Sequence, residues 1–501
     1  MTTSAAGRML IAAGVVLLLL ALLADAVGLG KPGFQAAQVL GVELSAVAIL
    51  TGAGLSRRLD RKSPRLGAGL RPAVDQILSL PTPVWLVAGF VAVYAALFVH
   101  PMFFNTERRI QYFTRYIPEI APIGDDLTEY AGTIRRVLID RQDYDNIYPP
   151  FFAVIMAPLL LLSYPANYRV VTSLTLLCFT LLLLGLPALI DRRRMSSVTV
   201  FFFITGAVSY GLQFELERGQ FSLIAFSAAL AAIYLHRYHD FFWPLAFVLF
   251  TVSIQLKIFP VLLMPLFVKD WRDSRGNLRR IGLLGLANAG LLLALGLQTF
   301  VAFWVAVTGT TTSSQFAPYD HSLRSFALEL GTSGLQIFPA DATAWFRANG
   351  AAVSAAVLFL LGVCAGSLMT RAYVRREQGL NLDLLLVCTI GALILPSVSF
   401  DYKLALLPPA MALALSGRPA PRQSLRWLAA SMSLLLSCAY SVTLFSFVDR
   451  PFYLANSVPL LLAIVGCITV LSFCDGGNIA PDTRVSPLRR QTPDRADTRP
   501  A

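Results

Sequence analysis

The chain has 501 residues, of which 56% are hydrophobic and only 14% are charged, and its net charge is +12. Because soluble domains carry about 25% charged residues, this composition excludes an ordinary water-soluble protein. The basic residues fall in short clusters between apolar runs, a pattern that favours the positive-inside rule of membrane proteins over a nucleic-acid-binding surface.

Several apolar runs reach or approach the length that crosses a bilayer, which is about 20 residues. They include Leu10 to Leu29, Ile281 to Phe303 and Val458 to Phe473. Helices satisfy their own backbone hydrogen bonds in lipid, so we predict an all-α polytopic membrane protein with about 12 to 14 transmembrane helices. The first run exceeds the about 7–15 apolar residues of a signal peptide, and we expect it to be retained.

Six basic clusters place one side of the chain in the cytoplasm. They predict an N-terminal unit of two helices and a basic loop (residues 1–82), a membrane core (residues 83–474) and a cytoplasmic tail (residues 475–501). The tail has almost no apolar residues, which is typical of a disordered segment. Two long loops, residues 105–150 and 308–350, fall on the opposite face. We therefore expect a multi-pass protein of the plasma membrane with both termini cytoplasmic.

The first long loop contains an amphipathic pattern. Leu127, Tyr130 and Ile134 recur at helical spacing, which predicts a helix that lies on the membrane surface. A glycine precedes it, and we expect Asp125 or Asp126 to cap the helix through a carboxylate oxygen. Two adjacent aspartates cannot both cap, so the other is available as a general base.

The segment of residues 241–268 lies between two basic clusters that both face the cytoplasm. It must enter and leave the membrane on the same side, as a hairpin of short helices or as a re-entrant segment, with Lys257 near its tip. A lysine at this depth costs about 3 kcal/mol on insertion scales, so it should face a partner or a water-filled cavity. It is then suited to bind an anion such as a lipid phosphate. The alternative is that it snorkels to the interface.

Four short segments follow one another between about Asp125 and Pro409. They are Asp126 with Tyr130 and Tyr148-Pro149-Pro150, then Gly219-Gln220 at the start of a helix, then Leu256-Lys257-Ile258-Phe259-Pro260, and finally Ser397-Val398-Ser399-Phe400-Asp401-Tyr402-Lys403-Leu404. In this order they resemble segments of glycosyltransferase family 87. The resemblance implies a multi-helix membrane enzyme of the GT-C type, with its active site on the extracytoplasmic face and a polyprenyl-phosphate sugar as donor.

The resemblance also implies roles for individual residues. Asp126, or Asp125, would be the base that activates the acceptor, and Lys257 would contact the donor phosphate. Asp126, Gln220, Lys257 and Asp401 are then expected to line one cavity that opens to the outer leaflet. The donor cavity is expected to be lined by Gln220, Glu215, Glu217, Arg218, Asp401 and Lys403.

This sequence departs from the family in its late external loop, where Asn-Gln-Ser is common and Asp320-His321-Ser322 stands instead. The departure leaves the acceptor open, with His321, Tyr130 and Tyr148 as candidates on that side. His321 is a candidate acid or base, although a single histidine in an exposed loop is more often a bystander. The sequence also has three apolar runs before the first long loop where many GT-C enzymes have one.

The function these residues indicate is transfer of a sugar, mannose or another hexose or arabinofuranose, from a polyprenyl phosphate to an extracytoplasmic glycan or glycolipid, with inversion. The donor is already activated, so no cofactor is expected. No cluster of histidine and aspartate at ligand spacing indicates a metal, although metal dependence is not excluded. The expected partners are membrane lipid, the lipid-linked donor and the acceptor. The alternatives are a transporter or flippase of lipid-linked sugars, which also places charges within the membrane, and a lipid-linked polysaccharide polymerase or ligase.

Overall fold

The computed structural model describes residues 82–94, 124–140, 144, 146–191, 196–207, 209–312, 320–332, 339–377, 379–416 and 457–474, together with Val16. Within these ranges the chain forms helices and turns, and the one extended pairing is an isolated bridge between Asp320 and Phe400. The all-α prediction is confirmed for this part of the chain. Most of the predicted N-terminal unit, residues 105–123 of the first long loop and the predicted tail lie outside the described residues, so the predictions for them stay predictions.

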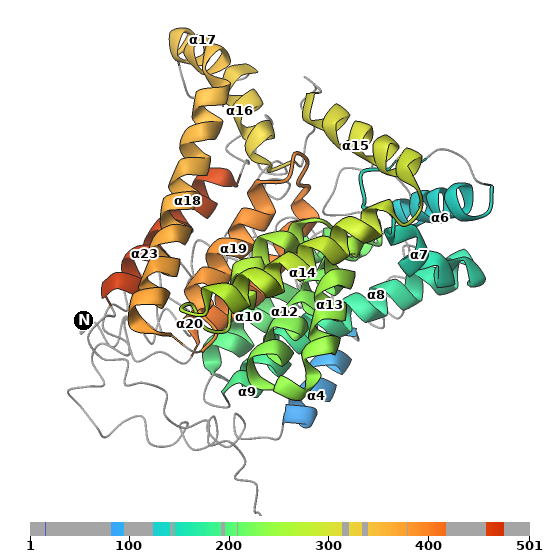
Figure 1. The fold of residues 1–501 in the computed structure, drawn as a ribbon, viewed down its shortest axis with the longest axis horizontal. Helices are drawn as coiled ribbons and strands as arrows, with labels where there is room; N and C mark the ends of the chain where they lie inside the picture. The colour runs from blue at the N-terminus through green and yellow to red at the C-terminus, as the bar shows by residue number, and fades with distance from the viewer. Residues whose placement is uncertain are drawn as a thin grey trace, which may run out of the picture.

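Within the continuously described ranges, the helices follow one another with short connections (Figure 1). The first half contains α4 (Thr82–Tyr94), α6 (Asp125–Leu138), α7 (Phe152–Met156), η4 (Ala157–Leu161), α8 (Tyr164–Thr180), η5 (Leu181–Gly185), α9 (Leu186–Ile190), α10 (Ser197–Ala207), α11 (Tyr210–Arg218), α12 (Ser222–Tyr238), η7 (Asp240–Phe242), α13 (Trp243–Leu256) and η8 (Phe259–Phe267). The second half contains α14 (Ser274–Leu293), α15 (Leu297–Thr312), α16 (Leu323–Thr332), α17 (Ala340–Ala348), α18 (Gly350–Arg375), α19 (Leu382–Ile394), η10 (Asp401–Leu406), α20 (Leu407–Leu415) and α23 (Val458–Cys474).

Two of the described helices are long and apolar enough to cross a membrane, namely Ala166–Ile190 and Gly350–Arg375. Two further pairs, α10 with α11 and α14 with α15, satisfy the same criterion if each bent pair counts as one span. The apolar run from Ile281 to Phe303 does not form one straight helix, because the chain turns by 101° between α14 and α15. Gly296 lies in that turn with φ +103°, a conformation that L side chains rarely adopt. The described residues thus hold two to four candidate spans, and the total of about 12 to 14 stays a prediction.

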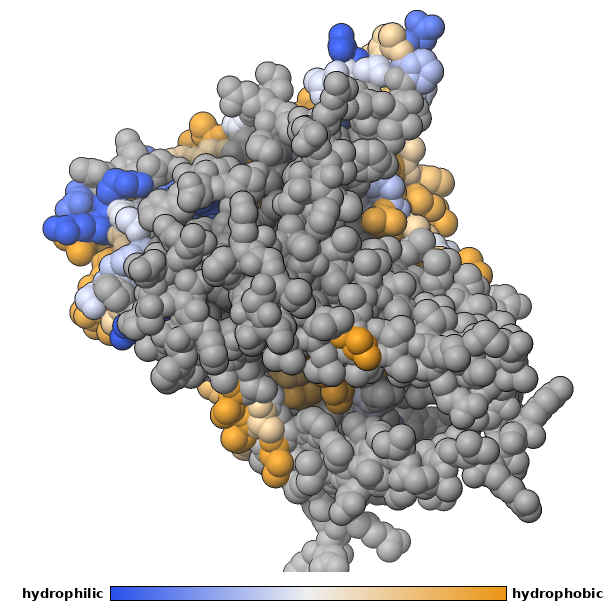
Figure 2. Space-filling model, turned by 180° about the vertical axis from the view of Figure 1, so that it is seen from behind, coloured by the Kyte–Doolittle hydropathy of each residue, from blue (hydrophilic) through white to orange (hydrophobic). Residues whose placement is uncertain are grey.

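The centre of the molecule is formed by helices that are apolar on every side. All of α19 and nearly all of α20 are buried, and α12 packs along α13 in an antiparallel pair. Apolar side chains also cover much of the outside, where Leu161, Leu278, Leu286 and Phe359 are among the most exposed. Among the coloured residues in Figure 2, the most hydrophilic surface gathers at two projecting ends, near α17 and α6. Exposed apolar flanks of this extent indicate a protein that meets lipid.

The segment of residues 241–268 returns to the side from which it starts. Arg237, at the end of α12, donates hydrogen bonds to the carbonyl oxygens of Leu266 (3.1 Å) and Val268 (2.5 Å). Lys269 forms a hydrogen-bonded ion pair with Asp240. The ends of the segment are therefore held together, as expected for a hairpin, and the turn between α13 and η8 lies at its far end.

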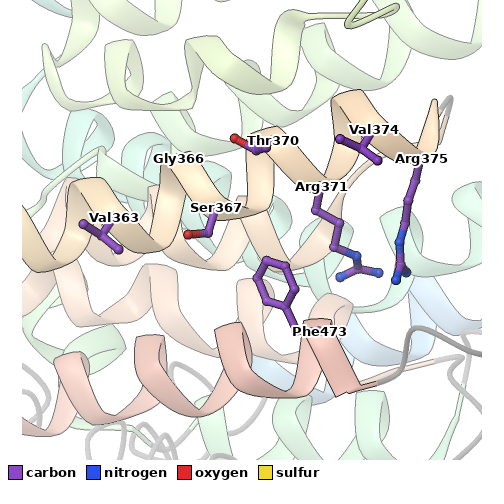
Figure 3. A pocket seen from close by; sticks show the side chains of 8 residues that line it. All are labelled: Val363, Gly366, Ser367, Thr370, Arg371, Val374, Arg375 and Phe473. Carbon is purple, nitrogen blue, oxygen red and sulfur yellow. The ribbon is translucent and has the colours of Figure 1, made fainter.

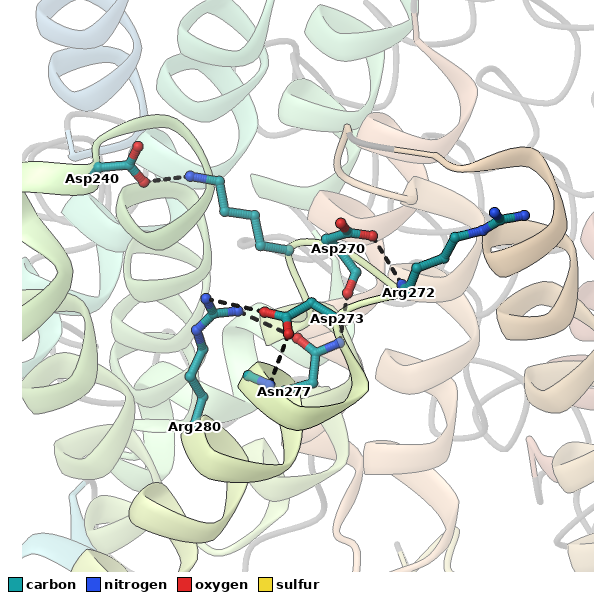
Figure 4. A network of polar contacts seen from close by, with 8 residues as sticks. Asp240, Asp270, Arg272, Asp273, Asn277 and Arg280 are labelled. Atoms are coloured by element: carbon teal, nitrogen blue, oxygen red, sulfur yellow. Dashed lines mark hydrogen bonds and ion pairs between the residues drawn. The ribbon is translucent and has the colours of Figure 1, made fainter.

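A polar network follows directly on this hairpin (Figure 4). The Asp273 carboxylate caps α14 by accepting from the backbone N–H of Gly276 at 2.9 Å, and it also lies 3.7 Å from Arg280. Asn277 donates to the Asp270 carbonyl at 2.6 Å. These contacts fix the basic loop against the start of α14, so they keep the base of the hairpin rigid.

Candidate active site

The start of α6 is fixed against the end of α11 by two glycines in the left-handed conformation. Gly124 (φ +70°) ends the loop before α6, and its backbone N–H donates to the Glu217 carbonyl at 2.6 Å. Gly219 (φ +66°) ends α11, and a Cβ there would lie 2.7 Å from the Leu127 side chain. Only glycine permits both the backbone angle and the close approach. This crossing brings Asp126 beside residues 218–220.

The amphipathic helix is confirmed, but its expected cap is wrong. Gly124 occupies the N-cap position, where no side chain caps the helix, and both aspartates lie in the first helical turn. Their surroundings differ. The Asp126 side chain is 11% exposed and its Oδ1 lies 2.9 Å from Nη2 of Arg218, whereas the Asp125 side chain is 44% exposed and lies 3.9 Å from the same arginine. The structure therefore separates one buried carboxylate from one at the surface.

Asp126 is held at both carboxylate oxygens. Arg218 contacts Oδ1, and Nε2 of Gln220 donates a hydrogen bond to Oδ2. Burial raises the pKa of the Asp126 carboxyl, and the charge of Arg218 and the Gln220 hydrogen bond partly offset this effect. A carboxylate with a raised pKa and a fixed orientation is suited to accept a proton.

Gln220 uses its whole amide group. Nε2 also donates to the hydroxyl of Tyr130 at 2.7 Å, and Oε1 accepts from Nζ of Lys257 at 2.5 Å. The Tyr130 hydroxyl lies 2.8 Å from that of Tyr148. Since a lysine can only donate, Lys257 fixes which end of the amide faces Asp126. Gln220 therefore joins the carboxylate to the lysine.

Lys257 lies in an aromatic cage. Its Nζ is 4.7 Å from the ring centre of Tyr402, 4.8 Å from that of Phe221 and 5.2 Å from that of Tyr148. The residue is only 3% exposed, so it does not snorkel to an interface. Cation–π contacts of about 0.5–2 kcal/mol each offset part of the cost of burying the charge. Lys257 meets the expectation of a partner within the protein rather than that of an open water-filled cavity.

A second cluster contains the late external loop and the corner before η10. His321 lies with Nδ1 3.0 Å from Oδ1 of Asp401 and with Nε2 3.3 Å from the hydroxyl of Ser399. The Asp320 carboxylate accepts from the backbone N–H groups of Ser399 (2.8 Å) and Ser322 (2.9 Å). These contacts and the Asp320–Phe400 bridge join two segments that are far apart in the sequence.

The expectation that His321 is an exposed loop residue is wrong, because His321 and Asp401 are both fully buried. Burial, aided by the charge of Lys403, lowers the pKa of His321 to about 3. The imidazole is therefore neutral near pH 7. With Asp401 ionised, Nδ1–H donates to that carboxylate and Nε2 accepts from the Ser399 hydroxyl.

The two clusters meet at η10. The ring of Tyr402 lies on Lys257 and on Phe214, whereas its neighbours Asp401 and Lys403 belong to the second cluster. Nζ of Lys403 donates to the Val398 carbonyl at 3.0 Å. The structure thus joins Asp126 to Lys257 through Gln220 and pairs Asp401 with His321, and the expectation of one shared cavity stays a prediction.

Two predicted cavity residues have local roles in the helices around the site. Oε1 of Glu215 accepts from the backbone N–H of Leu223 at 2.9 Å, at the start of α12. Glu217 is buried, and its backbone carbonyl receives Gly124. Gly219 ends α11 and α12 begins at Ser222, so the expectation that Gly219-Gln220 opens a helix is wrong by two residues.

Sequence reasoning missed several members of these clusters. Phe221 and Tyr402 adjoin residues that it did select, but an aromatic residue in an apolar segment carries no signal of its own. Ser399 and Asp320 were noted only as part of longer motifs. Among the described residues, no group of three or more His, Cys, Asp or Glu side chains is arranged to hold a metal ion.

Comparison with known proteins identifies the family. The model of glycosyltransferase family 87 matches residues 146–396, which is half of the chain, and the chain belongs to that family. Membership indicates a glycosyltransferase. The matched region includes Gln220, Lys257 and His321, begins after Asp126 and ends before Asp401. No curated protein and no solved structure matches this chain.

Proposed function

We propose that the chain is a membrane glycosyltransferase that moves a sugar from a polyprenyl phosphate to a hydroxyl of a glycan or glycolipid on the extracytoplasmic face. The observation that carries this proposal is the Asp126 carboxylate. It is buried at the start of α6, held between Arg218 and Gln220, and linked through Gln220 to Lys257. In a glycosyltransferase, a fixed carboxylate beside cations provides both a base and charge to stabilise a departing phosphate.

In the proposed reaction, the acceptor hydroxyl attacks the anomeric carbon of the donor sugar. Asp126 takes the hydroxyl proton as the new glycosidic bond forms. The bond from the anomeric carbon to the phosphate oxygen breaks, and the polyprenyl phosphate leaves with the electron pair. One displacement inverts the configuration, and the lipid phosphate needs no further activation.

The positions of the cations refine the expected donor contacts. The Arg218 side chain is 27% exposed and adjoins Asp126, so a phosphate that approaches the carboxylate meets this arginine first. Arginine is also the better bidentate partner for a phosphate. Lys257 is enclosed by three rings and Gln220, so we assign it the support of Gln220 and a longer-range electrostatic effect. The shape of the packed site determines which sugar and which acceptor it takes, and the assay below identifies both.

The direct test uses the full chain, purified and reconstituted in lipid nanodiscs. The samples receive polyprenyl-phosphate mannose or polyprenyl-phosphate arabinofuranose together with a panel of glycan and glycolipid acceptors. The proposal expects release of free polyprenyl phosphate and a matching glycosylated product, and no reaction with nucleotide sugars. If the donor moves across a liposome membrane without any product, the chain is a transporter and the proposal is wrong.

A further inference from the structure

A groove of about 620 Å³ runs along the outside of α18, away from both clusters described above. α18 is a candidate membrane span of 26 residues, and only 22% of its most apolar stretch is buried, so most of its surface faces outward. α23 packs beside it, and Figure 3 shows Phe473 of α23 reaching toward α18 next to the side chains of Arg371 and Arg375. The groove therefore opens sideways, toward lipid.

The residues that line the groove on α18 recur every three to four positions. Val363, Gly366, Thr370 and Val374 follow this spacing, so they occupy one face of the helix. From residue 363 to residue 375 a helix rises about 18 Å. This length is close to half of the roughly 30 Å hydrocarbon core, which is the depth of one leaflet.

The chemistry changes from one end of this face to the other. Val363 and Gly366 form the apolar end, and Ser367 and Thr370 bring hydroxyl groups to the middle. Arg375 follows in the last turn of α18, and Arg371 lies one turn before it. An apolar channel with cations at the helix end has the polarity of an anionic phospholipid.

Arg371 and Arg375 differ in how far their side chains are buried. The Arg371 side chain is 4% exposed, and its guanidinium lies 3.6 Å from Glu377 and 3.9 Å from Asp383. Both pairs keep Arg371 in place at the floor of the groove. Arg375 is exposed at the groove end, where a planar guanidinium can donate two parallel hydrogen bonds to a phosphate.

There is room for an acyl chain on the apolar side. A Cβ added at Gly366 would meet no atom within 4 Å, so the helix surface is open at that position. Phe473 forms the opposite wall and is itself half-exposed. A lipid tail would fill this space and pack against both apolar walls.

We propose that this groove binds one anionic phospholipid from the leaflet at the C-terminal end of α18. The phosphate contacts Arg375 and Arg371, and one acyl chain lies along Gly366 and Val363. Basic pockets between membrane helices commonly bind anionic headgroups in this way. The groove shares no residue with the Asp126–Gln220–Lys257 cluster, so the proposal does not depend on the proposed reaction.

The experiment measures lipid binding by native mass spectrometry of the delipidated full chain in detergent, titrated with phosphatidylglycerol or phosphatidylcholine. The wild type should retain one phosphatidylglycerol in preference to phosphatidylcholine. Gly366→Leu fills the groove, and Arg375→Gln removes the phosphate contact. Each should lower phosphatidylglycerol retention by about tenfold, as expected for the loss of one charge-assisted contact or of the space for a chain.

Matched controls lie on the same kinds of surface. Gly362→Leu adds the same side chain at another open position of α18 that does not line the groove, and Arg279→Gln removes an exposed arginine of α14. Both should bind as the wild type does, and equal thermal midpoints should show that all variants fold. Unchanged retention in Gly366→Leu, an equal loss in Arg279→Gln, or equal retention of the two phospholipids overturns the proposal. Displacement of phosphatidylglycerol by an equal amount of polyprenyl phosphate assigns the groove to the carrier lipid and also overturns it.

Discussion

Replacing Asp126 by asparagine removes the proposed base while keeping the size of the side chain. General base catalysis contributes about 10²–10⁴-fold to a rate, which corresponds to roughly 2.7–5.4 kcal/mol of activation free energy. We therefore expect kcat/KM of Asp126→Asn to fall by two to four orders of magnitude in the polyprenyl-phosphate release assay. Asp125→Asn is the matched control. Its half-exposed carboxylate lies 3.9 Å from Arg218, a surface pair worth about 0–1 kcal/mol, so its kcat/KM should change by less than about fivefold.

Stability gives a second, opposite expectation for the same variant. Because burial raises the pKa of Asp126, the folded protein favours the neutral carboxyl over the carboxylate. Above that pKa the ionised side chain lowers the free energy of unfolding, and asparagine removes this cost. The variant loses hydrogen-bond acceptance at one oxygen, but Arg218 is partly exposed and can turn to water. We expect the thermal midpoint of Asp126→Asn to equal or exceed that of the wild type near pH 7.

The test is decisive because it measures both kcat/KM and the thermal midpoint of Asp126→Asn. A variant that is inactive and at least as stable has lost chemistry and not structure. Activity close to that of the wild type, or an equal loss in Asp125→Asn, would refute the assignment of the base. A marked drop in the thermal midpoint would show instead that Asp126 is a structural residue.

Three further predictions follow from the same geometry. In a pH–rate profile, kcat/KM should rise with pH through a limb above pH 3.8 that reports the ionisation of Asp126. Arg218→Gln should move this limb to higher pH, because the arginine lowers the pKa of Asp126. A limb that does not move contradicts the pairing of Asp126 with Arg218. Gly219→Ala should lower the thermal midpoint by an equivalent of about 1–2 kcal/mol or more, because φ is +66° and the new Cβ meets a leucine of α6, whereas Gly285→Ala, with nothing within 4 Å, should not. His321→Gln should make stability less sensitive to acid than it is in the wild type. The unfolded histidine takes up a proton below about pH 6.5, whereas the folded one does so only near pH 3. The free energy of unfolding of the wild type therefore falls by up to about 1.4 kcal/mol per pH unit as the pH drops through this window. Identical slopes of thermal midpoint against pH in both proteins would count against the buried, neutral histidine.

The fold class and the elements of the site could be predicted from local sequence. An apolar fraction of 56% favours helices that contact lipid, and the spacing of Leu127, Tyr130 and Ile134 indicates which face of α6 is buried. Lys257 was selected because a charge within an apolar segment needs a partner. These inferences rest on periodicity and on the cost of burying polar groups, both of which are local properties of the chain.

The bend between α14 and α15 shows the limit of that reasoning. The run from Ile281 to Phe303 is predominantly apolar, and length alone favours one straight span. A single glycine with φ +103° turns the chain by 101°, because a glycine can be accommodated in a helix or can end one. Packing against other helices decides whether the helix continues or ends at this glycine, and the sequence of one segment does not contain that information.

The same distinction holds at the polar site that includes the first long loop. The sequence indicated Asp125 and Asp126 at the start of an amphipathic helix and Lys257 as a charge within an apolar segment, and the family resemblance added Gln220 and Asp401. Only the tertiary structure decided which aspartate is buried, through the crossing of two left-handed glycines at the ends of α6 and α11. It also paired Asp401 with His321 and enclosed Lys257 in aromatic rings. Each of these outcomes joins residues that are tens of positions or more apart, and contacts over such separations arise from the packing of whole helices.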